Sequence, residues 1–169
     1  KKPVSVIPCC ADMDLFDYIW IDADQKQQIR QKLNIPQDAF VLNYLGSIGT
    51  WYMLPEMLDF FKRLLKQKPK SVFHIVSQEQ PSLILGEAAK KGILPEQLVM
   101  TPAQRRELPE LLSIADFSIF FIKPAFSKQG SSPTKQGELM SMGIPVICND
   151  GIGDTDTIIA DSQSGFLVN

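Results

Sequence analysis

Short apolar runs alternate with helix-like segments along most of this 169-residue chain. Residues 117–122 read Phe-Ser-Ile-Phe-Phe-Ile, and so continuous an apolar run is expected of a central parallel strand covered on both faces. Residues 53–67 instead place their apolar side chains at the spacing of an amphipathic helix. This alternation favours a doubly wound α/β fold, in which a parallel sheet carries helices on both faces.

The alternation can be followed through the whole chain. Strands are predicted over residues 40–45, 71–76, 97–100, 116–122, 144–148 and 165–168. Helices are predicted over residues 25–33, 53–67, 81–91, 108–115, 133–142 and 154–160. Residues 4–8 are predicted to be extended. Residues 1–39 are therefore interpreted as a leading segment with one short helix, and residues 40–169 as the sheet domain.

Composition narrows the class of protein. The chain has the length of one domain, and 44% hydrophobic with 21% charged residues is an ordinary globular composition. A net charge of −2 without a basic stripe argues against nucleic-acid binding. No apolar run approaches membrane-span length, and the sequence shows no charged start followed by an apolar secretory segment. Because the chain starts at Lys1 rather than Met, we expect a fragment of a longer protein.

Cysteine and histidine offer little for catalysis. Cys9 and Cys10 are adjacent, which is not a zinc-site spacing, and Cys148 is distant. All three are expected to be reduced, in an intracellular protein. His74 is the single histidine and falls inside a predicted strand, so we interpret it as structural rather than catalytic. No Ser-His-Asp or Cys-His set can be assembled.

Several polar residues follow predicted strands. Ligands of doubly wound sheets bind at the carboxyl ends of the strands. Gly46, Thr101 and the stretch Ser131 to Lys135 all lie in loops after strands, so we expect them to converge at one edge. Gly46 and Gly49 form a Gly-x-x-Gly pattern that would suit a ligand phosphate or simply a tight turn.

The stretch from Gly130 to Glu138 reads as a helix start aimed at an anion. Ser132 is predicted to be the N-cap, because its hydroxyl can accept from an unpaired N–H of the first turn. Pro133 then takes the first helical position and Lys135 the third. A cation there faces the positive end of the helix dipole, which is favourable only if a phosphate binds the free N–H groups and the lysine. The alternative is a solvated surface lysine.

Hydroxyls and a carboxylate accompany this lysine. Ser131, Ser132 and Thr134 suit a diphosphate. Glu138 lies about 4–5 Å along the helix axis from Thr134 or Lys135, so its carboxylate could accept from two vicinal ribose hydroxyls. The combination predicts a nucleotide-diphosphate site. An exposed helix residue is the alternative for Glu138.

Two Asp-x-Asp triplets, Asp12–Asp14 and Asp154–Asp156, are candidate cation ligands beside a diphosphate. Such triplets also serve as turn and N-cap residues. Asp154 follows two glycines where a helix should begin, which favours capping there.

The order of these segments resembles the group 1 (family 4) retaining glycosyltransferases, specifically the C-terminal, donor-binding half of their GT-B fold. Residues 132–147 are similar to the family pattern SxPxKxxExMAxGxPVI and form the most specific part of the resemblance. Four further segments match in order: 6–16 resembles the interdomain IPNGVD…F segment, 44–47 the first strand and glycine turn, 111–116 the stretch before the central strand, and 165–168 the closing GfLV.

The resemblance implies a Rossmann-like parallel sheet of about six strands that binds a nucleoside-diphosphate sugar, with UDP or GDP as the nucleotide. It implies retaining transfer of a hexosyl group to a glycan or lipid-linked acceptor, held by an N-terminal domain absent from this chain. We expect no cofactor and no metal. Glu138 would bind the ribose, and Lys135 would stabilise the leaving diphosphate. The full-length protein is expected in the cytoplasm, with a peripheral position at the inner membrane face as a further option.

The chain also departs from the family pattern. Gly130 stands eight residues before Glu138, where the family has the glutamate that touches the sugar. Ser47 and Ile48 replace the basic residues that many members carry after the glycine turn, and Lys123 or Lys128 could compensate. Two alternatives therefore stay open: a nucleotide-sugar-binding module without catalysis, and a flavodoxin-like interaction domain with no small ligand. The fragment alone is predicted not to catalyse transfer.

Overall fold

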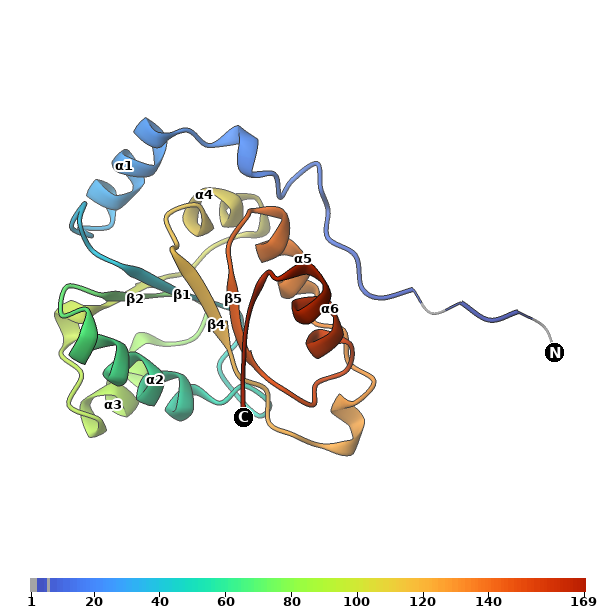
Figure 1. Ribbon diagram of the computed structural model, residues 1–169. Helices are drawn as coiled ribbons and strands as arrows, with labels where there is room; N and C mark the ends of the chain where they lie inside the picture. The colour runs from blue at the N-terminus through green and yellow to red at the C-terminus, as the bar shows by residue number, and fades with distance from the viewer. Residues whose placement is uncertain (1–2, 6) are drawn as a thin grey trace.

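The computed structural model shows one six-stranded parallel sheet with the strand order β3-β2-β1-β4-β5-β6 (Figure 1). It describes residues 3–5 and 7–169. Val6, part of the segment predicted to be extended, and Lys1 lie outside the described residues. The strand order reverses direction between β1 and β4, which is the position where doubly wound sheets bind their ligands.

The elements follow the predicted alternation. The strands are β1 (Val41–Leu45), β2 (Val72–Val76), β3 (Leu98–Thr101), β4 (Phe117–Phe120), β5 (Val146–Asn149) and β6 (Gly165–Val168). The α-helices are α1 (Ala23–Lys32), α2 (Leu54–Gln67), α3 (Pro81–Lys90), α4 (Leu108–Leu112), α5 (Thr134–Ser141) and α6 (Thr155–Ser162). The predicted Rossmann-like α/β fold is confirmed.

Two predicted elements are shorter than expected. The helix predicted over 108–115 ends at Leu112, and the strand predicted over 116–122 ends at Phe120. Beyond Phe120 the chain leaves the ladder, because the carbonyl of Phe121 accepts from Met53 and the N–H of Ile122 donates to the side chain of Asn149. Apolarity alone did not reveal that Phe121 and Ile122 bond to Met53, just before α2, and to the last residue of β5.

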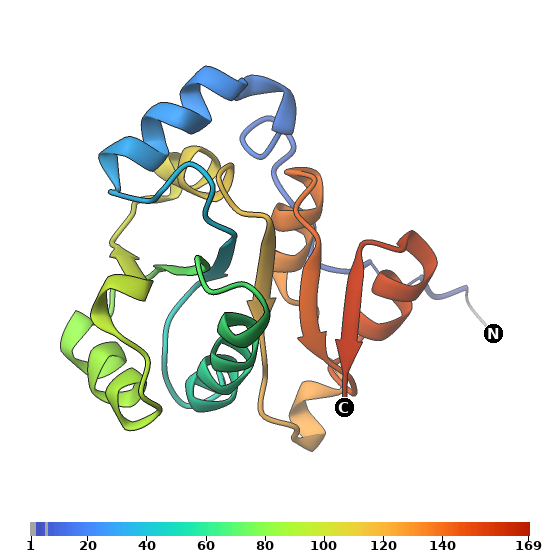
Figure 2. The ribbon, with the colours of Figure 1, turned by 60° about the vertical axis from the view of Figure 1, so that its left-hand side comes forward.

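Helices cover both faces of the sheet. Right-handed crossovers put α2 and α3 on one face and α4, α5 and α6 on the other (Figures 1 and 2). Leu54, Met57, Leu58 and Phe61 form the buried stripe of α2. Burial of such side chains stabilises the fold by about 1.5–3 kcal/mol each. None of the helices in the described part of the chain combines the length and apolarity that crossing a membrane requires.

One face of the β5–β6 end of the sheet carries no helix, as Figure 2 shows. The rings of Phe40 and Phe117 stack there at 6.0 Å, and the ring of Phe166 lies 6.0 Å from that of Phe117. They help to line an apolar hollow of about 270 Å³. Helices therefore cover both faces of the sheet over β1–β3, but only one face at the β5–β6 end.

Helix α1 lies beyond the amino ends of the strands and is fixed by Arg30 (Figure 1). The guanidinium of Arg30 donates to the carbonyls of Ala39, at 2.9 Å, and Ile114, at 3.1 Å, and lies 3.7 Å from the Asp116 carboxylate. Ile29 is buried in the same small cluster. The opposite end of the sheet, where the strands have their carboxyl ends, is formed by loops.

Candidate functional site

The glycine turn after β1 encloses the end of the Lys135 side chain. Nζ of Lys135 donates to the carbonyl oxygen of Leu45 at 2.6 Å. Gly46 has a φ of +135°, which favours glycine, and a Cβ there would lie 2.5 Å from Nζ. The sequence thus brings Gly46 and Lys135 together, as expected from their positions after strands.

Aromatic rings surround the same ammonium group. Nζ of Lys135 lies 3.8 Å from the ring centroid of Tyr52 and 4.9 Å from that of Tyr44. Burial lowers the pKa of Lys135 to about 7, against the opposing effect of the Glu138 charge. Tyr44 in turn donates to the carbonyl of Ser47 at 2.6 Å. Lys135 is therefore not the solvated surface lysine of the alternative interpretation.

The start of α5 differs from the prediction. The helix begins at Thr134, so Pro133 occupies the N-cap position and Lys135 the second helical position. Ser132 does not cap it, because its hydroxyl accepts from the N–H of Cys9 at 3.2 Å and donates to Asp154 at 3.1 Å. Ser132 thus anchors two distant segments instead.

The capping prediction for Asp154 also fails in part. Asp154 precedes α6, but its side chain makes no cap hydrogen bond. Its Oδ2 accepts from Ser132, and Asp156 instead accepts from the N–H of Gly151 at 3.0 Å. Asp12 accepts from the N–H of Leu15 in a turn. Among the described residues, no three His, Cys, Asp or Glu side chains group closely enough to hold a metal ion.

A hollow of about 250 Å³, lined by both aromatic and hydroxyl side chains, opens between the loop after β1 and the start of α5. Ser131 and Ser132 lie on one side of it, and Trp51 on the other. Lys128 also lines it, with Nζ 4.2 Å from the ring centroid of Trp51. Thr134 is exposed at the first position of α5. This hollow joins the two predicted phosphate-binding segments.

Glu138 is buried and paired. Its side chain is 5% exposed, and Oε1 accepts from Nη1 of Arg105 at 2.7 Å. The alternative of an exposed helix residue is therefore wrong. Arg105 belongs to a 3-10 turn, Arg105–Glu107, in the loop after β3. The sequence reasoning missed Arg105, although the strand-end argument applied to Thr101 would have drawn attention to this loop.

Thr101 ends β3 and is held by the strand beside it. Its hydroxyl lies 3.1 Å from Nε2 of His74, which is fully buried on β2. Burial lowers the pKa of His74 to about 4, so the ring is neutral at pH 7. The contact agrees with a structural His74. Thr101 lies on β3, two strands from β1. The loop that follows Thr101 reaches Glu138 through the side chain of Arg105.

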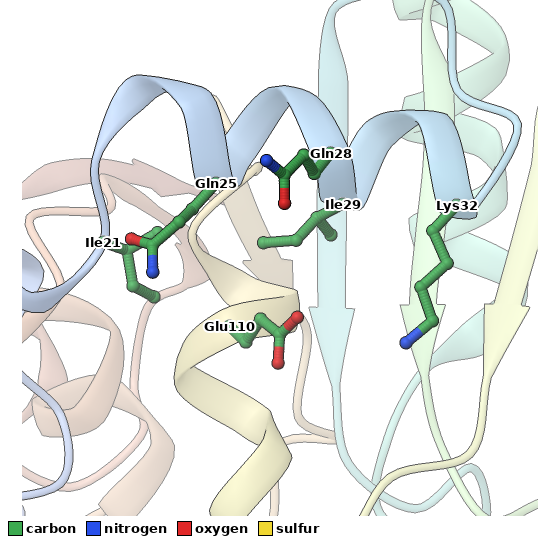
Figure 3. Close-up of a pocket in the computed structure, with 6 residues that line it drawn as sticks. All are labelled: Ile21, Gln25, Gln28, Ile29, Lys32 and Glu110. Atoms are coloured by element: carbon green, nitrogen blue, oxygen red, sulfur yellow. The ribbon is translucent and has the colours of Figure 1, made fainter.

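A second hollow lies away from this edge, between α1 and α4 (Figure 3). Gln25, Gln28 and Lys32 approach it from α1, and Glu110 from α4. It measures about 380 Å³ and is the larger of the two. Its position at the amino ends of the strands is the opposite of where parallel sheets bind ligands.

A family model described as glycosyl transferases group 1 matches residues 25–169. The chain belongs to this family. The resemblance carried by residues 132–147 and the segments around them is thereby confirmed.

Relatives of this glycosyl transferase domain are distant in sequence and close in fold. It is 24% identical over 161 residues to a putative teichuronic acid biosynthesis glycosyltransferase of Bacillus subtilis, covering 94% of this chain and 36% of that protein. The crystal structure of WaaG, a glycosyltransferase involved in lipopolysaccharide biosynthesis, superposes with a TM-score of 0.76 at 19% identity, over 97% of this chain and 42% of that chain.

A further structural relative is Anabaena Alr3699/HepE, crystallised in complex with UDP-glucose. It gives a TM-score of 0.69 at 17% identity, over 94% of this chain and 41% of that chain. These likenesses show that the domain has the fold of one half of a GT-B glycosyltransferase. The chain spans about a third of the length of the curated relatives it matches.

Proposed function

We propose that this domain binds the nucleoside-diphosphate sugar donor of a glycosyltransferase at the carboxyl edge of its sheet. In this proposal the donor-binding residues are Gly46, Ser47, Thr101, Ser131, Ser132, Thr134, Lys135 and Glu138. The diphosphate lies between the glycine turn and the first turn of α5, and the ribose reaches Glu138. The proposed domain boundary falls between residues 39 and 40.

The observation that carries the proposal is the pairing of an anion-binding helix start with a buried carboxylate. In the described part of the chain, the N–H groups of Thr134 and Lys135 donate to no acceptor within the protein. Helix N-termini of this kind favour phosphate. Glu138 is buried about one turn further along the same helix. A diphosphate joined to a ribose matches these two features in order.

The structural likeness to HepE, which was crystallised with UDP-glucose, supports a uridine nucleotide as the first one to test. In the proposed reaction, Lys135 stabilises the diphosphate as it leaves the sugar. Retention of configuration, independence from metal, a GDP donor and a glycan or lipid-linked acceptor on another domain are finer parts of the same proposal. So are a cytoplasmic location and attachment at the inner membrane face.

A thermal-shift panel of UDP, GDP, ADP and CMP sugars tests the binding site. A nucleotide sugar at about 100-fold its Kd should raise the Tm by about 5–10 °C. Lys135→Met and Glu138→Gln should lose most of that shift, whereas Gln28→Ala, in the hollow below α1, should keep it. No shift with any nucleotide would favour the interaction domain, and equal shifts in all variants would move the site elsewhere.

A module that binds nucleotide sugar without catalysis is the second candidate, and Gly130 favours it. No carboxylate stands at that position, and a Cβ there would meet only open space. Assays should show no transfer by residues 1–169 alone, because the acceptor would bind elsewhere. Transfer by the longer protein would support the enzyme, and its absence the module. Turnover by residues 1–169 at the rate of the longer protein would contradict the proposal that the acceptor site lies outside them.

A further inference from the structure

Arg105 is the side chain that fixes the orientation of the Glu138 carboxylate. We propose that Arg105 is a positioning residue for ribose recognition: it holds Oε1 of Glu138 and leaves Oε2 to accept from a ribose hydroxyl. The inference rests on the proposed function, since it assigns a selectivity determinant to the same nucleotide site. It adds that the site distinguishes ribonucleotides from deoxyribonucleotides through a residue of the β3–α4 loop.

The Glu138 carboxylate is buried and has one charged partner. The Glu138 side chain is 5% exposed, and a carboxylate so buried requires a charged or hydrogen-bonding partner. Nη1 of Arg105 supplies it at 2.7 Å, a length typical of a charge-assisted bond. Within residues 3–5 and 7–169, Oε2 accepts no hydrogen bond. One oxygen is therefore fixed by the protein and the other is available.

The Arg105 side chain is 54% exposed, and one aromatic contact orients it. Its guanidinium carbon lies 5.2 Å from the ring centroid of Phe16, which is fully buried. The turn that carries it is closed by Glu107, whose Oε2 accepts from the N–H of Gln104 at 2.7 Å. A guanidinium held over a ring has a defined plane, so it can direct the carboxylate as a flexible ammonium cannot.

The free oxygen of Glu138 calls for a hydroxyl donor on the ligand. A single fixed acceptor oxygen beside a helix start that favours phosphate selects a hydroxyl at a set distance from the phosphate. In this proposal the donor is the 2′-hydroxyl of the ribose, which 2′-deoxyribose lacks. A site built to accept from a hydroxyl discriminates against the analogue that lacks it, here by about tenfold or more.

The test compares UDP with 2′-deoxy-UDP by calorimetry on the whole chain. The parent should bind UDP about tenfold more tightly. Arg105→Met should bring the two affinities close together, chiefly by weakening UDP, and Arg105→Lys should recover only part of the difference. Arg106→Met, an exposed neighbour, should behave as the parent. Arg105→Lys keeps a positive charge beside Glu138 and provides a variant should Arg105→Met fail to fold.

Two results would overturn the inference. An Arg105→Met protein that keeps the parent's ratio, or loses affinity for both nucleotides equally, would show that the ion pair only stabilises the fold. A parent that binds UDP and 2′-deoxy-UDP equally would remove ribose selectivity while leaving nucleotide binding intact. A parent that binds neither nucleotide would instead overturn the proposed function, and the inference with it.

Discussion

Lys135 keeps an ammonium group beneath the glycine turn, largely screened from water by the rings of Tyr44 and Tyr52. Burial lowers its pKa to about 7, so about half of the free protein carries the charge at neutral pH. A bound diphosphate would favour the protonated form and raise that pKa. Binding of an anionic donor should therefore take up a proton above pH 7.

Affinity for UDP-glucose should consequently depend on pH. The contribution of Lys135 is full below its free-state pKa of about 7 and is lost as the pH rises above it, by up to about tenfold per unit. Calorimetry from pH 6 to pH 9 measures this slope. UDP-glucose is a better ligand than UDP for this measurement, because the diphosphate of UDP-glucose does not titrate in this pH range. Lys135→Met should bind weakly and without the slope; an unchanged slope would assign it to another group.

The position of Lys135 was predictable only in part. Its placement after a strand put it at the same edge as Gly46, and the structure brings the two together. The inward direction of its side chain depends on Tyr44 and Tyr52, whose rings meet only once β1 and the following loop are folded. Likewise, the pairing of Arg105 with Glu138 joins two elements 33 residues apart in sequence, and no local spacing reveals it.

Among the elements, the sheet was predicted best. Apolar runs of strand length mark β1, β2 and β4, because strands buried in a parallel sheet carry little polar sequence. The start of α5 was predicted one residue too early. The rule for N-caps considers a local hydroxyl and a local N–H, whereas the hydroxyl of Ser132 is used by Cys9 and Asp154 from other elements.

Helix α1 depends on one arginine for its attachment. Arg30 is 13% exposed and donates to the carbonyls of Ala39 and Ile114. Since hydrogen bonds from a charged group are worth about 1.5–3 kcal/mol each, Arg30→Met should lower the free energy of unfolding by about 2–4 kcal/mol. Denaturant titration measures this, with Arg106→Met as the matched exposed control. A cost within error of that control would show that Arg30 does not anchor α1 to the sheet.

In the whole molecule, the topology places the candidate site. The strand order reverses between β1 and β4, and the loops after these two strands are bound to each other. Met53 donates to the carbonyl of Phe121 at 3.0 Å, and Tyr52 pairs with Ile122. The glycine turn, the start of α5 and the loop that carries Arg105 surround this point. The larger hollow below α1 lies at the other end of the sheet.

The most direct test is to map the binding of UDP-glucose onto the backbone by NMR. Amide shifts of the labelled chain should change most at Gly46, Ser47, Thr101, Ser131, Ser132, Thr134 and Lys135. The amide shift of Glu138 should change less. Those of Gln25, Gln28 and Lys32, which line the hollow in Figure 3, should stay unchanged. Changes centred on that hollow, or no change at saturating UDP-glucose, would contradict a donor site at the carboxyl edge.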